Sequence, residues 1–183
     1  MIISAKEIPN ELNEELIKKE IFTTGIQELE FWKSAVKEDK RLFNLIFGYI
    51  FSADHRLAWR SCWIIDTTTA VFPDLLAEKL PDLINALLVT KDGSLKRHFT
   101  RMLCRYPIPD QYQTAIVDRC FELLLPSEPA AVRVNAMQLL FNIAQLFPDL
   151  KVELALVIEN LVEEGGSAGF MNRAQKLLLQ LGH

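Results

Sequence analysis

The chain has 183 residues, a formal net charge of −4 and an apolar fraction of 50%. This length and composition favour one domain with a continuous hydrophobic core, and they exclude a disordered chain. The acidic balance argues against a dedicated nucleic-acid-binding protein, because such proteins carry a basic excess. The first residues do not follow the pattern of a signal peptide and no apolar run could span a membrane, so we expect a cytoplasmic protein.

The N-terminal part of the chain is expected to form helices over about residues 9–53. The first helix is predicted to open at Pro9 and Asn10, because proline suits a first helical turn and acidic residues follow at once. The apolar stripe expected for this helix is Leu12, Leu16 and Ile17.

Thr23-Thr24-Gly25 predicts a break after the first helix, since glycine and threonine are common where helices end. A second helix is then expected over about residues 26–37. A third helix follows a charged turn, and its inward positions are predicted to be Leu42, Ile46, Phe47, Ile50 and Phe51.

The rest of the chain repeats one helical face at almost constant spacing. Within each copy the positions stand at offsets of 0, 4, 7 and 8, which place them on one side of a helix. The four copies are Leu57, Ser61, Ile64 and Ile65; Leu95, Phe99, Met102 and Leu103; Val132, Ala136, Leu139 and Leu140; and Phe170, Ala174, Leu177 and Leu178.

A second apolar series lies between these copies and has the same period, so two helical faces recur together. Its copies are Ile46, Phe47, Ile50 and Phe51; Leu83, Ile84, Leu87 and Leu88; Cys120, Phe121, Leu124 and Leu125; and Val157, Ile158, Leu161 and Val162. We call the helices of the first series the first helices of each repeat, and the others the second helices.

Prolines and polar residues mark the turns between helices. An aromatic residue precedes proline at three of the turns, and an aspartate follows each pair as a predicted helix cap: Asp74, Asp110 and Asp149. Ser94 and Ser167 are the expected N-caps of two first helices. The first helix of the repeat that contains Leu103 is predicted to be shorter than its neighbours.

An antiparallel helix pair of this length cannot bury both of its apolar faces alone, whereas stacked pairs can. We therefore predict an all-α protein, a right-handed α-α superhelix of about four repeats. The stretch from Val132 to Leu140, VRVNAMQLL, resembles the first helix of a HEAT repeat, and the period resembles the HEAT/armadillo superfamily. The expected organisation is a single domain, 1–183, with its clearest repeats at about 54–90, 93–126 and 128–164 and a final helix at 167–181.

The densest basic pattern is Arg97, Arg101 and Arg105, which stand at i, i+4 and i+8 on one predicted helix. Such a stripe is a candidate site for phosphate, for a nucleic-acid backbone or for an acidic partner. The alternative is a solvated face whose arginines pair with acidic residues of adjacent repeats. Arg119, on the next predicted helix, belongs to the same candidate surface.

A second candidate cluster is Trp59, Arg60 and Trp63, with Asp66 one turn further on. HEAT-like DNA glycosylases that act on alkylated bases use tryptophans, an aspartate and basic residues, and this cluster resembles that set faintly. The resemblance would imply a carboxylate that stabilises a cationic sugar and aromatic walls that hold DNA. The alternative is one tryptophan in the core, one at an edge, and a paired Asp66.

No other chemistry is indicated by the sequence. The histidines have no metal-ligand spacing, and nucleophile-elbow and phosphate-loop motifs are missing, so we expect no metal, no cofactor and no enzymatic activity. The three cysteines, Cys62, Cys104 and Cys120, are expected to be buried, reduced thiols.

The expected function is a scaffold that binds another macromolecule, a protein, through its concave face. A nucleic acid or a second copy of the chain are the other partners considered. We expect the second helices to line the concave face, and their mixed charges favour a protein partner over a nucleic acid. The last helix ends with an apolar run that includes Leu177, Leu178, Leu179 and Leu181, so we expect one of its flanks to be covered.

Overall fold

A computed structural model describes residues 13–182, and within this range all regular secondary structure is helical. The chain divides into two compact units, Met1–Lys79 and Leu80–His183, which are described separately. The predicted helix start at Pro9 and Asn10 lies outside the described residues. The prediction of a single domain over the whole chain stays a prediction.

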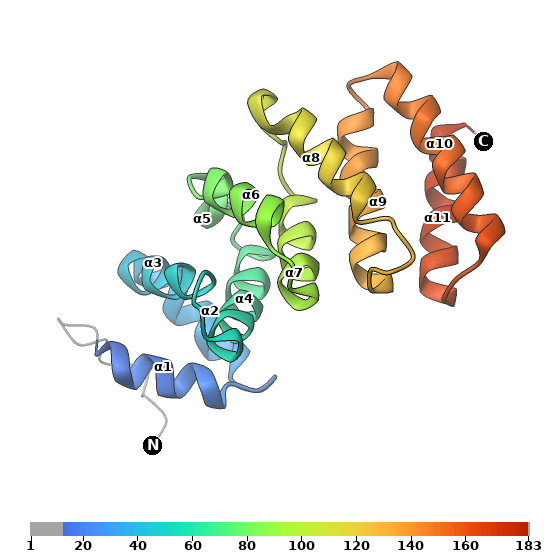
Figure 1. The fold of residues 1–183 in the computed structure, drawn as a ribbon. Coiled ribbons are helices and arrows are strands. Elements are labelled where there is room, and N and C mark those ends of the chain that lie inside the picture. Colours follow the sequence, from blue (N-terminus) through green and yellow to red (C-terminus); the bar gives the residue numbers. More distant parts are fainter. Residues whose placement is uncertain (1–12, 183) are drawn as a thin grey trace. The chain divides into compact units, whose positions relative to one another are not determined.

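The first unit contains five helices in its described part, α1 (Glu14–Thr23), α2 (Leu29–Glu38), α3 (Lys40–Tyr49), α4 (His55–Thr69) and the single turn α5 (Asp74–Ala77). Helix α4 is its centre, because α1, α2 and α3 all pack against it (Figure 1). The core is formed by large apolar side chains from these helices, among them Ile21, Phe43, Ile46, Ile64 and Ile65. Leu16, expected to face inward, is 40% exposed.

The break between α1 and α2 is longer than the sequence pattern indicates. The carboxylate of Glu28 accepts a hydrogen bond from the Gly25 backbone N–H at 2.8 Å, which holds a turn before the helix. Ile26, predicted to begin the helix, is 77% exposed, and α2 begins at Leu29 instead. Trp32 then fixes the turn from the helix side, since its Nε1 donates to Thr24 Oγ1 at 2.7 Å.

The second unit contains six helices, α6 (Leu80–Val89), α7 (Gly93–Leu103), α8 (Asp110–Glu122), α9 (Ala130–Ala144), α10 (Pro148–Glu164) and α11 (Ala168–Leu181). The pairs α6–α7, α8–α9 and α10–α11 are each in contact. The predicted repeats instead pair each first helix with the helix that follows it, and α9–α10 are in contact in this way. Helices α7, α9 and α11 lie side by side in one layer, and α6, α8 and α10 form the other (Figure 1). We call them the first layer and the second layer.

The first apolar series is confirmed as the core-facing side of its helices. All sixteen positions are buried except Leu95 and Leu178, which are half-buried. Ser61 fits the series because it is small, and its side chain is fully buried in α4. The short first helix is also confirmed, since α7 has 11 residues whereas α4 and α9 have 15 each.

The second apolar series is wrong at its fourth position. Phe51 is 46% exposed and Leu125 is 57% exposed, while Leu88 and Val162 are half-buried. Helices α3 and α8 end at Tyr49 and Glu122, so the two exposed residues lie beyond the regular helix that the period assumes. The apolar pattern in the sequence therefore continues beyond the last residue of the helix.

Helix starts show how the polar residues at the turns are used. Asp74, Asp110 and Asp149 are not caps, because Pro73, Pro109 and Phe147 hold the N-cap positions. The aspartates lie in the first turn instead, where a negative charge is favoured by the helix dipole.

The two predicted serine caps have different outcomes. Ser94 is replaced as the N-cap of α7 by Asp92, whose carboxylate accepts from the backbone N–H groups of Ser94 and Leu95. Ser167 is confirmed, because its hydroxyl accepts from the Phe170 N–H at 3.4 Å. The residue that caps α7 is therefore the aspartate two positions earlier.

Helix α9 is central in the second unit, since it packs on α7, α8, α10 and α11. The prediction that the second helices line the concave face stays a prediction.

The last helix has less uncovered apolar surface than its leucines suggest. Phe170, Ala174 and Leu177 of α11 are buried against α9 and α10, and among the large apolar residues of α11 only Leu179, at 75%, is strongly exposed. Polar residues occupy most other outward positions of the helix. The expectation that a flank of α11 is covered by a second copy, by a partner or by the N-terminal helix stays a prediction.

A candidate binding surface on the first layer

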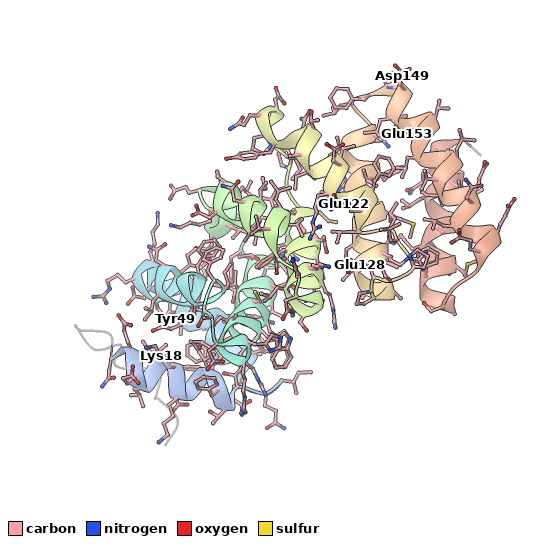
Figure 2. The ribbon with its side chains drawn as sticks, viewed as in Figure 1. Lys18, Tyr49, Glu122, Glu128, Asp149 and Glu153 are labelled. Carbon is pink, nitrogen blue, oxygen red and sulfur yellow. The ribbon has the colours of Figure 1, made fainter. Side chains whose placement is uncertain are left out.

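Charge is divided between the two layers of the second unit. Within their bounds, α7, α9 and α11 carry six basic residues and no aspartate or glutamate: Lys96, Arg97, Arg101, Arg133, Arg173 and Lys176. The second-layer helices carry nine acidic residues against two basic ones, and Figure 2 shows Glu122 on α8 and Asp149 and Glu153 on α10. The unit therefore has one positive and one negative layer.

Polar side chains cross the outer surface of the first layer in a connected row. The side-chain amide of Asn135 on α9 donates to the Arg97 carbonyl of α7 at 3.1 Å, and Asn142 donates to the Cys104 carbonyl at 2.9 Å. On the other side of α9, Arg173 of α11 donates to Gln138 at 3.0 Å. These bonds join the three helices on their solvent side, and we call this surface the basic face.

An open hollow of about 320 Å³ lies on the basic face near the N-terminal ends of α9 and α11. Arg97 and Arg101 of α7 form one wall, and the start of α11 forms the opposite wall. Small side chains of α9 lie between them. The lining residues are Arg97, Arg101, Ala130, Ala131, Val134, Asn135, Ser167, Gly169 and Phe170.

The three arginines of the predicted stripe differ in their exposure and in whether they line the hollow. Arg97 is exposed and Arg101 half-buried, and both line the hollow. Arg105 follows the C-terminal end of α7, is half-buried, and is not part of the hollow's lining. The i, i+4, i+8 stripe therefore contributes two of its three members to the site.

Arg119 is anchored in the fold. Its guanidinium donates to the Leu87 carbonyl at 3.2 Å and to the Thr90 carbonyl at 2.7 Å, at the C-terminal end of α6, and it pairs with Glu122 at 2.7 Å. A cation at this place satisfies carbonyls that have no partner within their own helix. Arg133 acts in the same way on α8, because its Nε donates to the buried Leu124 carbonyl at 2.9 Å.

Lys96 is also paired within the fold. It is 8% exposed and forms an ion pair with Glu128, which precedes α9. Lys96 is buried and Glu128 is half-buried, so the pair is largely shielded from solvent. Arg97, Arg173 and Lys176 are the basic residues of α7, α9 and α11 that are exposed to solvent.

The Trp59, Arg60 and Trp63 cluster lies in the first unit, on α4. The two indole rings stack at 6.2 Å between centroids with an angle of 15°, and the Arg60 guanidinium lies 4.8 Å from the Trp59 ring centroid. Arg60 also donates to the Thr24 carbonyl just after α1, and Arg56 donates to the Phe22 carbonyl at 3.1 Å. The basic residues of this cluster therefore hold the end of α1.

The glycosylase alternative requires Asp66 to reach a nucleotide. Asp66 is 1% exposed and lies within α4, so its carboxylate is not presented to solvent. The cluster gives no support to base-removal chemistry, which needs an accessible carboxylate beside the extruded nucleotide.

Other chemistry is equally unsupported among residues 13–182. No group of three or more His, Cys, Asp or Glu side chains there could hold a metal ion, and none of the described helices has the length and apolar character to cross a membrane. Cys62 and Cys120 are buried, as expected, but Cys104 is half-buried. Burial raises the pKa of the Cys104 thiol to about 12, with Arg105 and Arg173 opposing the rise, and it raises the pKa of Cys120 as well.

The sequence pattern missed most residues of the hollow. Ala131, Val134 and Gly169 have no chemistry that would attract notice, and they matter because their small size leaves space between α7 and α11. One signal could have located the surface: the first helices of this unit lack acidic residues, which can be read from the sequence once the helices are paired into layers.

Comparison with known proteins identifies the architecture. A family model described as a HEAT repeat domain matches residues 12–181, which is nearly the whole chain. No curated protein and no solved structure matches it. Because the match covers both units and agrees with the all-helical paired architecture, the chain belongs to the HEAT repeat family.

Proposed function

We propose that this protein is a non-enzymatic HEAT-repeat scaffold that binds another protein through the basic face of α7, α9 and α11. The observation that supports this most directly is the charge of that face: Arg97, Arg173 and Lys176 are exposed on three adjacent helices that contain no aspartate or glutamate. Isolated surface charges are common, but a single-signed layer with a hollow in it is a feature of a recognition surface.

The shape of the unit supports the same surface. Helices α7, α9 and α11 lie side by side in the first layer, so a partner laid along it can contact several repeats at once. The hydrogen bonds of Asn135, Asn142 and Arg173 hold the three helices together on the solvent side. A prearranged surface of this kind loses little conformational entropy on binding.

A protein partner fits better than a nucleic acid. Proteins that bind single strands stack bases on exposed aromatic rings. The aromatic ring that lines the hollow belongs to Phe170, which is 1% exposed and has the Arg133 guanidinium 4.2 Å from its centroid. Its ring face is therefore already occupied.

Site-specific photo-crosslinking in cells that produce the protein tests this proposal. A photoreactive amino acid at Asn172, an exposed residue of α11, occupies the repeat position that corresponds to Arg97 and Val134 of the hollow. A matched control places the same group at Glu153, an exposed residue of α10 in the second layer.

We expect a discrete protein adduct from position 172 and none from position 153. The proposal fails if adducts form only from position 153, if no adduct forms from either position, or if the adduct from position 172 is a nucleic acid.

A further inference from the structure

We infer that the hollow on the basic face receives one bulky apolar side chain of the partner protein, and that aspartate or glutamate residues stand beside it in the partner's sequence. This contact rests on the proposed function and specifies how the basic face holds its partner. Two observations support it: most of the residues that line the hollow are apolar, and exposed cations lie on the same face.

The lining of the hollow suits an apolar group. Five of its nine residues have no polar side-chain atom, and three of these five, Ala130, Ala131 and Gly169, are exposed to solvent. Apolar surface in a concave site gains free energy when a partner covers it. A carboxylate would gain little from these residues, whereas a leucine, methionine or aromatic side chain would remove both apolar surfaces from water.

The wall that α7 forms contributes hydrocarbon as well as charge. Arginine side chains lay their methylene groups along apolar surface while the guanidinium stays in water. Arg101 is half-buried and already has an interaction partner within the chain, so we assign it to the wall and give its charge no part in the contact. Arg97 is exposed and places a positive charge at the border of the hollow.

The hollow is present before any partner binds. Its volume of about 320 Å³ is large enough for one bulky side chain, because the residues that α9 and the start of α11 place there are small. Asn135 on its border donates to the Arg97 carbonyl at 3.1 Å and thereby joins α9 to α7. A side chain that enters a preformed pocket contributes strongly to affinity, since little has to be ordered on binding.

The charges of the basic face determine which residues stand beside the apolar side chain. Arg97, Arg173 and Lys176 are exposed, and Lys176 occupies on α11 the repeat position that Arg101 has on α7. Helices α7, α9 and α11 contain no aspartate or glutamate that would attract a basic segment. Like charges across an interface are repelled and opposite charges are attracted, so charge complementarity selects an acidic segment.

Selection of peptides from a phage-displayed library of random dodecapeptides, carried out on the full chain, tests this contact. We expect the enriched sequences to share a leucine, methionine or aromatic residue with aspartate or glutamate beside it. In Ala131→Leu the new side chain fills the hollow, so this variant should not enrich them. The matched control Ala115→Leu makes the same change at an exposed position of α8 and should enrich the same sequences.

Ala131→Leu is suitable because it should not disturb folding. Position 131 is exposed in the first turn of α9, and leucine is a strong helix former like alanine. The melting temperature should therefore stay the same. Lost enrichment at unaltered stability then reports on the hollow itself.

A double-mutant cycle locates the apolar side chain. Replacing the apolar residue of an enriched, fluorescently labelled peptide by alanine should weaken binding to the unaltered chain roughly tenfold or more, because the buried surface is lost. The same replacement should cost less than about twofold in Ala131→Leu, where the hollow is already filled. Arg97→Glu should weaken binding of the original peptide roughly tenfold, whereas Lys19→Glu, at an exposed position of α1, should not.

Any of four results would overturn the apolar contact. These are no enrichment on the unaltered chain, enriched peptides that are basic or lack a bulky apolar residue, equal enrichment on Ala131→Leu, and an alanine replacement that costs the same in both chains.

The crosslinking experiment separates this contact from the scaffold function. A protein adduct from position 172 that persists in the Ala131→Leu chain would leave the scaffold function intact and remove the hollow from it. Absence of that adduct from the unaltered chain would instead contradict the scaffold function.

Discussion

The two layers of the second unit have the same repeat period and opposite surfaces. Both bury apolar residues at corresponding positions, so their inner sides are alike. On the outside, α7, α9 and α11 carry only basic charges, while α6, α8 and α10 are predominantly acidic. The difference shows that the repeat period predicts which side chains of each helix are buried. It does not predict the charge of the side chains that face solvent.

The same contrast separates two arginines that look equivalent in the sequence. Arg119 in the second layer is bound to the end of α6 through two carbonyls, whereas Arg97 in the first layer is exposed beside the hollow. A basic residue on a repeat protein is therefore a candidate for ligand binding only when its side chain is not already hydrogen-bonded to carbonyl groups at the end of a neighbouring helix.

The largest expected effect concerns the buried positions that the layers share. Leu140→Ala removes a fully buried side chain of the first series, and we expect it to lower the free energy of unfolding by about 2–5 kcal/mol. Leu125→Ala, at the fourth position of the second series, should change it by less than about 0.5 kcal/mol, because that side chain is 57% exposed. Urea unfolding followed by circular dichroism measures both, and equal losses would mean that the two series are buried alike.

An intermediate effect is expected for the arginines. Arg119→Met leaves the Leu87 and Thr90 carbonyls without their charged donor, so we expect a loss of roughly 1.5–3 kcal/mol. Arg97→Met should stay within about 0.5 kcal/mol, because Arg97 is exposed. The same urea titration measures both variants. A larger loss of stability for Arg97→Met than for Arg119→Met would contradict the structural role of Arg119.

The smallest effect concerns the thiol at the C-terminal end of α7. Burial raises the pKa of Cys104 to about 12 from an ordinary value of 9.0. Between these two pH values the folded chain therefore keeps the thiol proton, while the unfolded chain loses it. The contribution of this thiol to stability is fully present below pH 9 and is lost as pH rises through about 12.

Thiol labelling checks this shift near neutral pH. The native thiolate fraction of Cys104 should be about a thousandfold lower than that of an ordinary cysteine, so labelling of the folded chain should be correspondingly slow. Urea should restore a normal rate. Cys104→Ser provides the control, and fast labelling that this variant abolishes would show that the thiol is not protected.

Some of the structure was predictable because it depends on local pattern alone. The first series was right at almost every position, since offsets of 0, 4, 7 and 8 define a helical face whatever lies against it. The second series failed at Phe51 and Leu125, where the helix ends before the pattern does. The aspartates after the turns were misassigned as caps because a shift of one or two residues changes a cap into a first-turn residue.

The candidate site was predictable only in part, for a different reason. Arg97 and Arg101 stood out by spacing, but Arg119 and Arg60 shared their chemistry and were bound elsewhere by carbonyls from helices distant in sequence. Asp66 suggested chemistry that its burial removes. Contacts between repeats decide which charged side chains are bonded within the fold. The spacing of residues within one helix does not predict those contacts.

By itself the sequence determined the all-α class, the HEAT-like period and the side of each helix that is buried, because these follow from helical periodicity and the removal of apolar surface from water. Only the tertiary structure decided which helices lie side by side in each layer, which basic residues remain at the surface and where small side chains leave a hollow between α7 and α11. Those properties depend on how neighbouring helices pack, and packing brings together residues that no local pattern connects.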